Sequence, residues 1–112
     1  MGWPQPATKQ VPTRVEWHRQ ALEDLKRLDV KVQERIRRSV ADLKLLDDAR
    51  LRLAPYAENL RGYWKLRVGD YRLVCQLQRD DRGHAVLVVH VVNRRGAYLA
   101  RSIKTIKRRS ED

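Results

Sequence analysis

The sequence predicts an α+β domain: an N-terminal strand and a helical hairpin packed on a small antiparallel β-sheet, with a short helix at the C-terminal end. Three observations predict this class. Two segments before residue 47 carry apolar residues at helical spacing, three later segments have the pattern of β-strands, and short turn motifs separate these strands. Helices grouped ahead of a strand meander are typical of α+β domains. The 112 residues are enough for one domain with one modest core.

The N-terminal third is predicted to hold a tail, a strand and two helices. Residues 1–12 contain three prolines and no apolar stretch of signal-peptide type, so we expect a flexible tail. Polar and apolar residues alternate over 14–17, which suggests a short strand. Apolar residues then recur every three or four positions over 18–29 and again over 30–46, with Asp29 as the expected cap of the second helix. Two such helices with a short link form a hairpin.

The remainder is predicted to be mostly sheet. Residues 47–59 lose the helical period and are expected to form a loop with at most one helical turn. Strands are predicted over 63–67, 71–78 and 85–92, the last being a near-continuous aliphatic run typical of a buried central strand. Turn residues separate them, which predicts two hairpins to whose sheet the first strand is added. A final short helix is expected over 98–107.

The charge is uneven along the chain. The formal net charge is +11, and residues 60–109 carry thirteen Lys or Arg against three Asp, an excess of ten. The first half is nearly balanced. Charge on this scale indicates a polyanion partner, because it attracts nucleic acid, anionic membrane or acidic protein.

Several site classes find no support in the sequence. Cys75 is the only cysteine, which excludes an intramolecular disulfide, fits a reducing cytoplasm and predicts a small core residue. His18, His84 and His90 lack zinc-ligand spacing. We expect His18 at the surface or capping a helix, His84 in solvent, and His90 in the core or packed across strands. No segment has eighteen consecutive apolar residues, so no membrane span is predicted.

Strand alternation adds geometry to the basic half. Residues two apart on a strand point to one face, and neighbouring strands and the segment after them can bring further side chains to the same face. A concave basic site containing a phenol is one interpretation. A ladder of exposed cations beside a core tyrosine is an equally good one. The side chains concerned are Tyr63, Lys65, Arg67, Arg72, Arg94 and Tyr98.

Two motifs resemble the RelE/ParE toxin superfamily. Residues 60–74, Leu-Arg-Gly-Tyr-Trp-Lys-Leu-Arg-Val-Gly-Asp-Tyr-Arg-Leu-Val, are similar to the family core, in which L-R-G precedes K-L-R-x-G-x-Y-R-L-V-Y. Residues 91–98 are similar to its closing V-x-x-R-x-x-x-Y. Together with the strand and hairpin before them, the resemblance covers roughly residues 13–108, and it implies a single RelE-like toxin domain over 13–109.

The resemblance implies the toxin of a bacterial toxin–antitoxin pair, acting in the cytoplasm. RelE-type members enter the ribosomal A site and inhibit translation by cutting messenger RNA. The 2′-hydroxyl attacks the neighbouring phosphate, a 2′,3′-cyclic phosphate results, and neither metal nor cofactor is needed. The implied partners are ribosome and messenger RNA, together with an acidic or amphipathic antitoxin that neutralises the toxin in a hetero-oligomer.

The resemblance also assigns catalytic roles. Lys65 corresponds to a catalytic lysine, and Arg72 to an arginine that contacts the scissile phosphate. Arg94 corresponds to a late arginine that protonates the leaving group or stabilises the transition state, and Tyr98 to a tyrosine that positions the base. RelE has a second lysine where this chain has Tyr63, and Lys65 could accept a proton only if neighbouring cations favour its neutral form. The general base therefore stays open.

Further side chains are expected to bind RNA. Arg61 matches an arginine of the family that contacts the RNA backbone. The expected RNA-binding set is Arg61, Tyr63, Arg67, Arg95, Arg101 and Lys104.

The sequence leaves two other functions open. The ParE branch shares the fold and inhibits DNA gyrase without cutting RNA, although such chains usually have a longer hairpin and lack the basic catalytic cluster. A non-catalytic nucleic-acid-binding homologue is the third possibility. Loss of growth arrest on substituting both Arg94 and Tyr98 would argue against it.

Overall fold

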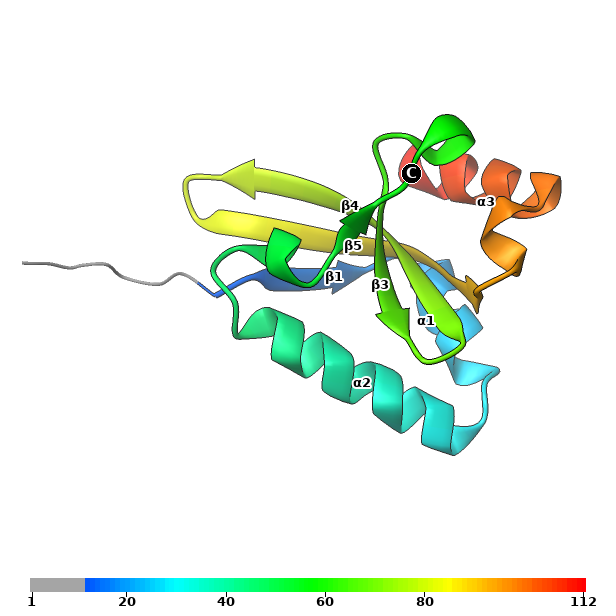
Figure 1. Cartoon of the computed structure of the whole chain (residues 1–112), viewed down its shortest axis with the longest axis horizontal. Coiled ribbons are helices and arrows are strands. Elements are labelled where there is room, and N and C mark those ends of the chain that lie inside the picture. Colours follow the sequence, from blue (N-terminus) through cyan, green and yellow to red (C-terminus); the bar gives the residue numbers. More distant parts are fainter. Residues whose placement is uncertain (1–11) are drawn as a thin grey trace, which may run out of the picture.

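The structure, a computed structural model, describes residues 12–112 and consists of one mixed β-sheet between two helical layers (Figure 1). The predicted tail over residues 1–12 therefore lies, apart from Pro12, outside the described residues. Within the described part, no helix is long and apolar enough to cross a membrane.

The predicted strand–helix–helix order is confirmed. β1 (Arg14–Trp17) leads into α1 (Arg19–Lys26) and α2 (Val30–Lys44). His18 caps α1, as expected, because its Nδ1 accepts a hydrogen bond from the Gln20 amide at 3.0 Å. Asp29 caps α2 in the same way, accepting from the Lys31 amide at 2.8 Å. Both caps satisfy amides that the helices themselves leave without partners.

The segment predicted as a loop contains more structure than expected. It holds two short 3₁₀ turns, η1 (Ala49–Leu51) and η2 (Glu58–Leu60), and a two-residue strand between them, β2 (Ala54–Pro55). β2 lies at the edge of the sheet, antiparallel to the strand that follows. Proline has no N–H to donate, so it is tolerated in an edge strand but is not typical of strands. A two-residue strand that contains proline is therefore hard to predict from the sequence.

The three predicted strands form the meander β3 (Trp64–Val68), β4 (Tyr71–Asp80) and β5 (Gly83–Asn93). The strand order is β1-β5-β4-β3-β2, and β1 runs parallel to β5. The sheet is thus antiparallel except at this one edge. The alternation of polar and apolar residues predicts a strand there but does not indicate its direction. The predicted C-terminal helix is α3 (Ala100–Ser110), preceded by the 3₁₀ turn η3 (Gly96–Tyr98).

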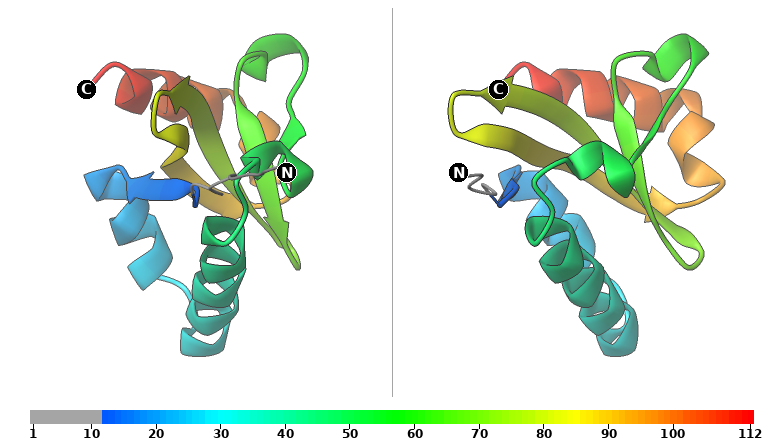
Figure 2. Two further views of the ribbon diagram at one scale, coloured as in Figure 1. Left: turned by 90° about the vertical axis from the view of Figure 1, so that its left-hand side faces the viewer. Right: turned by 60° about the vertical axis from the view of Figure 1, so that its left-hand side comes forward.

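Alternate residues of the sheet feed two hydrophobic cores. Leu66, Leu73 and Cys75 face α1 and α2, whereas Val74 and Val89 face α3. Figure 2 shows α3 on the opposite side of the sheet from α1 and α2. Cys75 is fully buried, which confirms its expected place in the core.

His84 corrects an expectation, because it is buried, not solvated. Its side chain packs beneath η1, where Nδ1 accepts a hydrogen bond from the Ala49 amide at 2.9 Å. The 3₁₀ turn needs an acceptor for this amide, and nothing in the local sequence around His84 indicates that demand.

A second correction concerns the C-terminal cations. Arg109, counted in the basic half, is buried, and its Nη1 donates to Asp24 Oδ2 at 2.7 Å and to the Val89 carbonyl at 2.9 Å. His90 Nδ1 lies 3.1 Å from the same carboxylate oxygen, so this largely buried ring contacts a carboxylate of α1, a partner that the expected core or cross-strand packing did not include. This polar cluster ties α3 to α1 and β5, and it removes one cation from the surface.

Burial by itself raises the pKa of Asp24. Hydrogen bonds from His90, Arg109 and the Val91 amide outweigh it and lower that pKa from 3.8 to about 2. Asp24 is therefore ionised in the folded protein over the ordinary pH range, as its pairing with a guanidinium requires.

Candidate functional site

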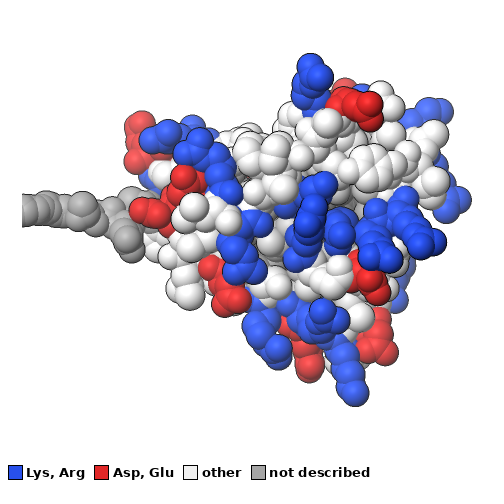
Figure 3. All heavy atoms as spheres, viewed as in Figure 1, with Lys and Arg blue, Asp and Glu red and all other residues white. Residues whose placement is uncertain are grey.

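A hollow of about 440 Å³ lies on the sheet face that carries α3, near the β3–β4 turn. We call it the basic cavity. Five of its seven lining residues are cationic, and none of the seven is acidic. Figure 3 shows Lys and Arg side chains gathered over this part of the molecule. The lining residues are Tyr56, Lys65, Arg67, Arg72, Arg94, Arg95 and Tyr98.

The β3–β4 hairpin supplies three of the cations. Lys65 and Arg67 are two apart on β3 and share a face, and Arg72 lies directly opposite Arg67 on β4. The Arg72 Nη1 donates to the carbonyls of Gly69 at 3.0 Å and Tyr71 at 2.8 Å, which holds its guanidinium beside the turn. These three cations line one hollow, as the first of the two interpretations predicts, whereas Tyr63 does not.

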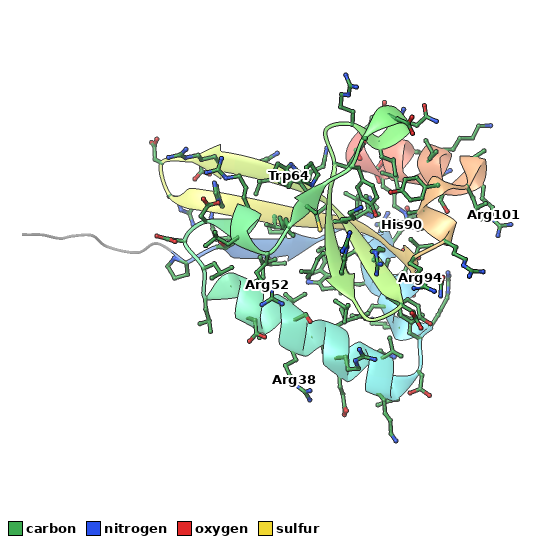
Figure 4. All side chains as sticks on the ribbon, viewed as in Figure 1. Arg38, Arg52, Trp64, His90, Arg94 and Arg101 are labelled. Atoms are coloured by element: carbon green, nitrogen blue, oxygen red, sulfur yellow. The ribbon has the colours of Figure 1, made fainter. Side chains whose placement is uncertain are left out.

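The segment after β5 supplies the other wall. The Arg94 amide donates to the Asp70 carbonyl at 2.7 Å, which fixes this segment against the β3–β4 turn. The guanidinium and carboxylate of these two residues are 3.8 Å apart and both exposed, so they form at most a weak ion pair. Figure 4 shows Arg94 beside the hairpin. Tyr98, from η3, stands at the rim with 58% of its surface exposed.

Tyr56 is a residue that sequence reasoning missed. The Lys65 ammonium lies 4.9 Å from the centre of the Tyr56 ring, within the range of a cation–π contact. The Tyr98 ring meets it edge to face, with centroids 5.8 Å apart and planes at 76°. Tyr56 thus contacts two of the four expected catalytic side chains. Only the pairing of β2 with β3 brings it there, and the sequence shows no signal for that pairing.

The hydroxyl of Tyr56 is buried and has no hydrogen-bond partner among the described residues. Burial is the main cause that raises its pKa far above the usual range, with the neighbouring Tyr98 adding to the effect. The hydroxyl therefore stays protonated and serves only as a neutral donor or acceptor.

Six of the ten side chains predicted for the site line the basic cavity, and four do not. Tyr63 lies on the same sheet face but under the end of α3, where its hydroxyl donates to Ser110 Oγ at 2.7 Å. Arg61 is exposed beyond η2. Arg101, labelled in Figure 4, and Lys104 are exposed on α3 and are not among the residues that line the basic cavity. The catalytic and RNA-binding roles of all ten side chains stay predictions.

The chemistry of the basic cavity is that of an anion site. Guanidinium groups match the oxygens of phosphate in a fork geometry and keep their charge at all ordinary pH values. Grouped around a hollow, such cations stabilise negative charge that develops on a phosphorane. Across residues 12–112, no group of three or more His, Cys, Asp or Glu is arranged to hold a metal ion.

Comparison with protein families gives one match. Residues 15–98 match the family described as the ParE toxin of the type II toxin–antitoxin system parDE. The matched segment begins in β1 and ends at Tyr98, so it spans the sheet, the hairpin and the whole basic cavity. Comparison with curated proteins gives no significant match.

Solved structures with the same fold include several toxins. The chain is similar to a protein of the toxin–antitoxin complex RelBE2 from Mycobacterium tuberculosis, with 26% identity, a TM-score of 0.64, and coverage of 77% of this chain and 95% of that one. A mutant of the toxin RelE from E. coli, in the free state, has 19% identity and a TM-score of 0.59 over 88% and 97% of the two chains. The archaeal RelE–RelB complex from Pyrococcus horikoshii has 21% identity and a TM-score of 0.54 over 74% and 96%.

Proposed function

This chain belongs to the ParE toxin family of type II toxin–antitoxin systems, within the ParE/RelE superfamily, and on that premise we propose that it cleaves messenger RNA on the ribosome. The observation that carries the proposal is the basic cavity. Lys65, Arg72, Arg94 and Tyr98, the four side chains that the resemblance assigns to RNA cleavage, all line it. A surface that only blocked another protein would not need a lysine, two arginines and a tyrosine grouped around one hollow.

The proposed reaction is attack of a ribose 2′-hydroxyl on the adjacent phosphorus. The 2′ oxygen loses its proton and bonds to phosphorus, the bond from phosphorus to the 5′ oxygen breaks, and that oxygen takes up a proton. In the proposal, Arg72 and Arg94 bind the non-bridging oxygens, whose charge grows in the phosphorane. Tyr98 stacks on a base and aligns the strand.

The proton transfers involve Lys65. The Lys65 ammonium lies over the ring of Tyr56, and this position inside the basic cavity suits a role as proton donor to the 5′ oxygen or as a fixed positive charge. Among residues 12–112, no carboxylate or imidazole lines the basic cavity. The acceptor of the 2′-hydroxyl proton stays open, and we propose the Lys65 amine or a group of the ribosome for this role. A cavity with so few proton-transfer groups suits an enzyme whose substrate is aligned by the ribosome.

A coupled translation reaction tests the proposal. Purified toxin is added to a defined message with and without ribosomes, and new 5′ ends are mapped. We expect cuts in translated message only. We also expect Arg72→Ala to slow cutting about 100-fold or more, the usual cost of one lost transition-state contact. Arg79→Ala is the matched control, because Arg79 is an exposed arginine of the same strand outside the basic cavity, and it should change the rate less than about twofold.

Two results would count against the proposal. An uncut message would overturn RNA cleavage altogether. Equal cutting of free and translated message would overturn the dependence on the ribosome and leave the nuclease in place.

Inhibition of DNA gyrase is the second candidate, because the matching family is described as the ParE toxin. A supercoiling assay with purified gyrase separates the two activities. Gyrase inhibition that survives Arg72→Ala, together with an intact message, would favour this candidate.

We also propose that a cognate antitoxin neutralises this chain. The M. tuberculosis and P. horikoshii relatives were both solved in toxin–antitoxin complexes. A net charge of +11 calls for an acidic or amphipathic partner. Relief of growth arrest by an adjacent small reading frame, with co-purification of its product, tests this.

A further inference from the structure

A second basic hollow, of about 220 Å³, lies where α2 meets the β3–β4 hairpin. We call it the α2 hollow. Three guanidinium groups line it against one carboxylate. Figure 4 labels Arg38 on α2. The lining residues are Arg35, Arg38, Ser39 and Asp42 of α2, with Arg67, Val68 and Gly69 of the hairpin.

Arg67 joins this hollow to the basic cavity, because it lines both. One guanidinium at the shared wall makes the two hollows neighbouring parts of a single basic track. The track starts on the sheet face that carries α3, passes the β3–β4 hairpin and reaches α2.

The backbone of the hairpin turn helps to form the α2 hollow. Gly69 has a φ of +57°, and a Cβ built on it would lie 2.6 Å from Arg35 Nη2. The Arg35 guanidinium therefore rests against the bare backbone of the turn, a position open to it only beside glycine. The ion pairs within residues 12–112 involve none of Arg35, Arg38 and Arg67, so these three guanidiniums keep their hydrogen-bonding capacity for a ligand.

We propose that the α2 hollow binds a phosphate of the RNA strand that flanks the cleaved bond. This inference rests on the proposed function, since it extends the same RNA beyond the basic cavity. A strand with its scissile phosphate beside Arg72 has further phosphates on both sides. On one side, the next phosphates would pass Arg67, which lines both hollows, and lie beside Arg35 and Arg38. Phosphate oxygens match the fork geometry of these guanidiniums.

The expected contribution follows from counterion release. Each phosphate neutralised on a single strand changes the slope of log K against log salt by about 0.7. Between 1 M and 0.1 M salt, such a contact therefore raises the binding constant about fivefold. Loss of the α2 hollow should therefore weaken binding of a long strand about fivefold. A strand too short to reach the hollow should be unaffected.

The test measures binding of fully 2′-O-methylated RNA, which lacks the attacking hydroxyl, to the full chain by fluorescence anisotropy. A trinucleotide and a nonanucleotide are compared over a range of salt concentrations. The variant is R35A/R38A. The matched control R37A/K44A removes the same charge from exposed positions of α2 that line a different groove, the one beside Trp17.

We expect R35A/R38A to weaken the nonanucleotide about fivefold at 0.1 M salt, to flatten its salt slope by about 0.7, and to leave the trinucleotide unchanged. The control should leave both affinities within about twofold. Equal weakening by the two double variants would overturn the inference, because only net charge would then matter. No weakening by R35A/R38A would also overturn it.

Arg72→Ala, run beside these variants, keeps the two proposals distinguishable. If it weakens both oligonucleotides while R35A/R38A has no effect, the α2 hollow is excluded and the RNA site in the basic cavity stands. If Arg72→Ala changes neither affinity, RNA binding in the basic cavity is itself refuted.

Discussion

Asp24→Asn should destabilise the protein strongly, because it removes the carboxylate that binds the buried guanidinium of Arg109. The Asp24 side chain is 11% exposed and that of Arg109 is 9% exposed. Removing one partner of a buried ion pair typically costs about 3–5 kcal/mol. The introduced amide still accepts one hydrogen bond, so we expect a loss of about 2–4 kcal/mol in the free energy of unfolding at neutral pH.

Part of this contribution depends on pH. The pKa of Asp24 is lowered from 3.8 to about 2 in the folded protein. Converted in full, this shift is worth about 2.5 kcal/mol, and solvent screening reduces it to about 1–2 kcal/mol. Because the folded pKa lies below the unfolded one, this stability is present above about pH 4 and is lost as the pH falls toward 2.

Urea denaturation monitored by circular dichroism measures both effects. Wild type and Asp24→Asn are compared at several values between pH 7 and pH 2, and the difference between them should shrink by about 1–2 kcal/mol below pH 4. Glu23→Gln is the matched control, an exposed carboxylate of the same helix, and it should change stability by less than about 0.5 kcal/mol. A difference that does not change with pH, or an equal loss in the control, would refute the reasoning.

Two further predictions concern Tyr56 and Cys75. Tyr56→Leu removes the ring that Lys65 and Tyr98 contact, so single-turnover cleavage should slow about tenfold. Tyr56→Phe keeps the ring, so its cleavage rate should stay within about twofold of wild type. An equal loss of rate in both variants would contradict a role for the ring. Cys75 is fully buried, and burial raises the pKa of its thiol to about 12. A thiol reagent at pH 8 should therefore label Cys75 only in denaturant. Rapid labelling of the folded protein would contradict its burial.

Local patterns were sufficient for most of the fold. The helices capped by His18 and Asp29 and the three strands of the meander follow from periodicity and turn residues, which act over a few positions. The same alternation correctly predicted that Lys65, Arg67 and Arg72 share one face. Position along a strand determines such a face without reference to distant parts of the chain.

The differences arise where distant segments meet. Tyr56 enters the basic cavity through a two-residue edge strand, and His84 is buried because η1 packs over it. Arg109 is buried because it pairs with a carboxylate 85 positions earlier in the chain. Arg35 joins a basic hollow only because α2 crosses the β3–β4 hairpin. None of these contacts has a local pattern, so charge counting treated the arginines as equivalent.

The chemical identity of the new RNA ends is the sharpest test of cleavage by 2′-hydroxyl attack. Purified toxin cuts a translated message, and mass spectrometry identifies the termini of the two fragments. We expect a 2′,3′-cyclic phosphate on the upstream fragment and a 5′-hydroxyl on the downstream one, with both formed about 100-fold or more slowly by the Arg72→Ala variant. Fragments ending in a 3′-hydroxyl and a 5′-phosphate would contradict attack by the 2′-hydroxyl, and an intact message would contradict RNA cleavage by the basic cavity.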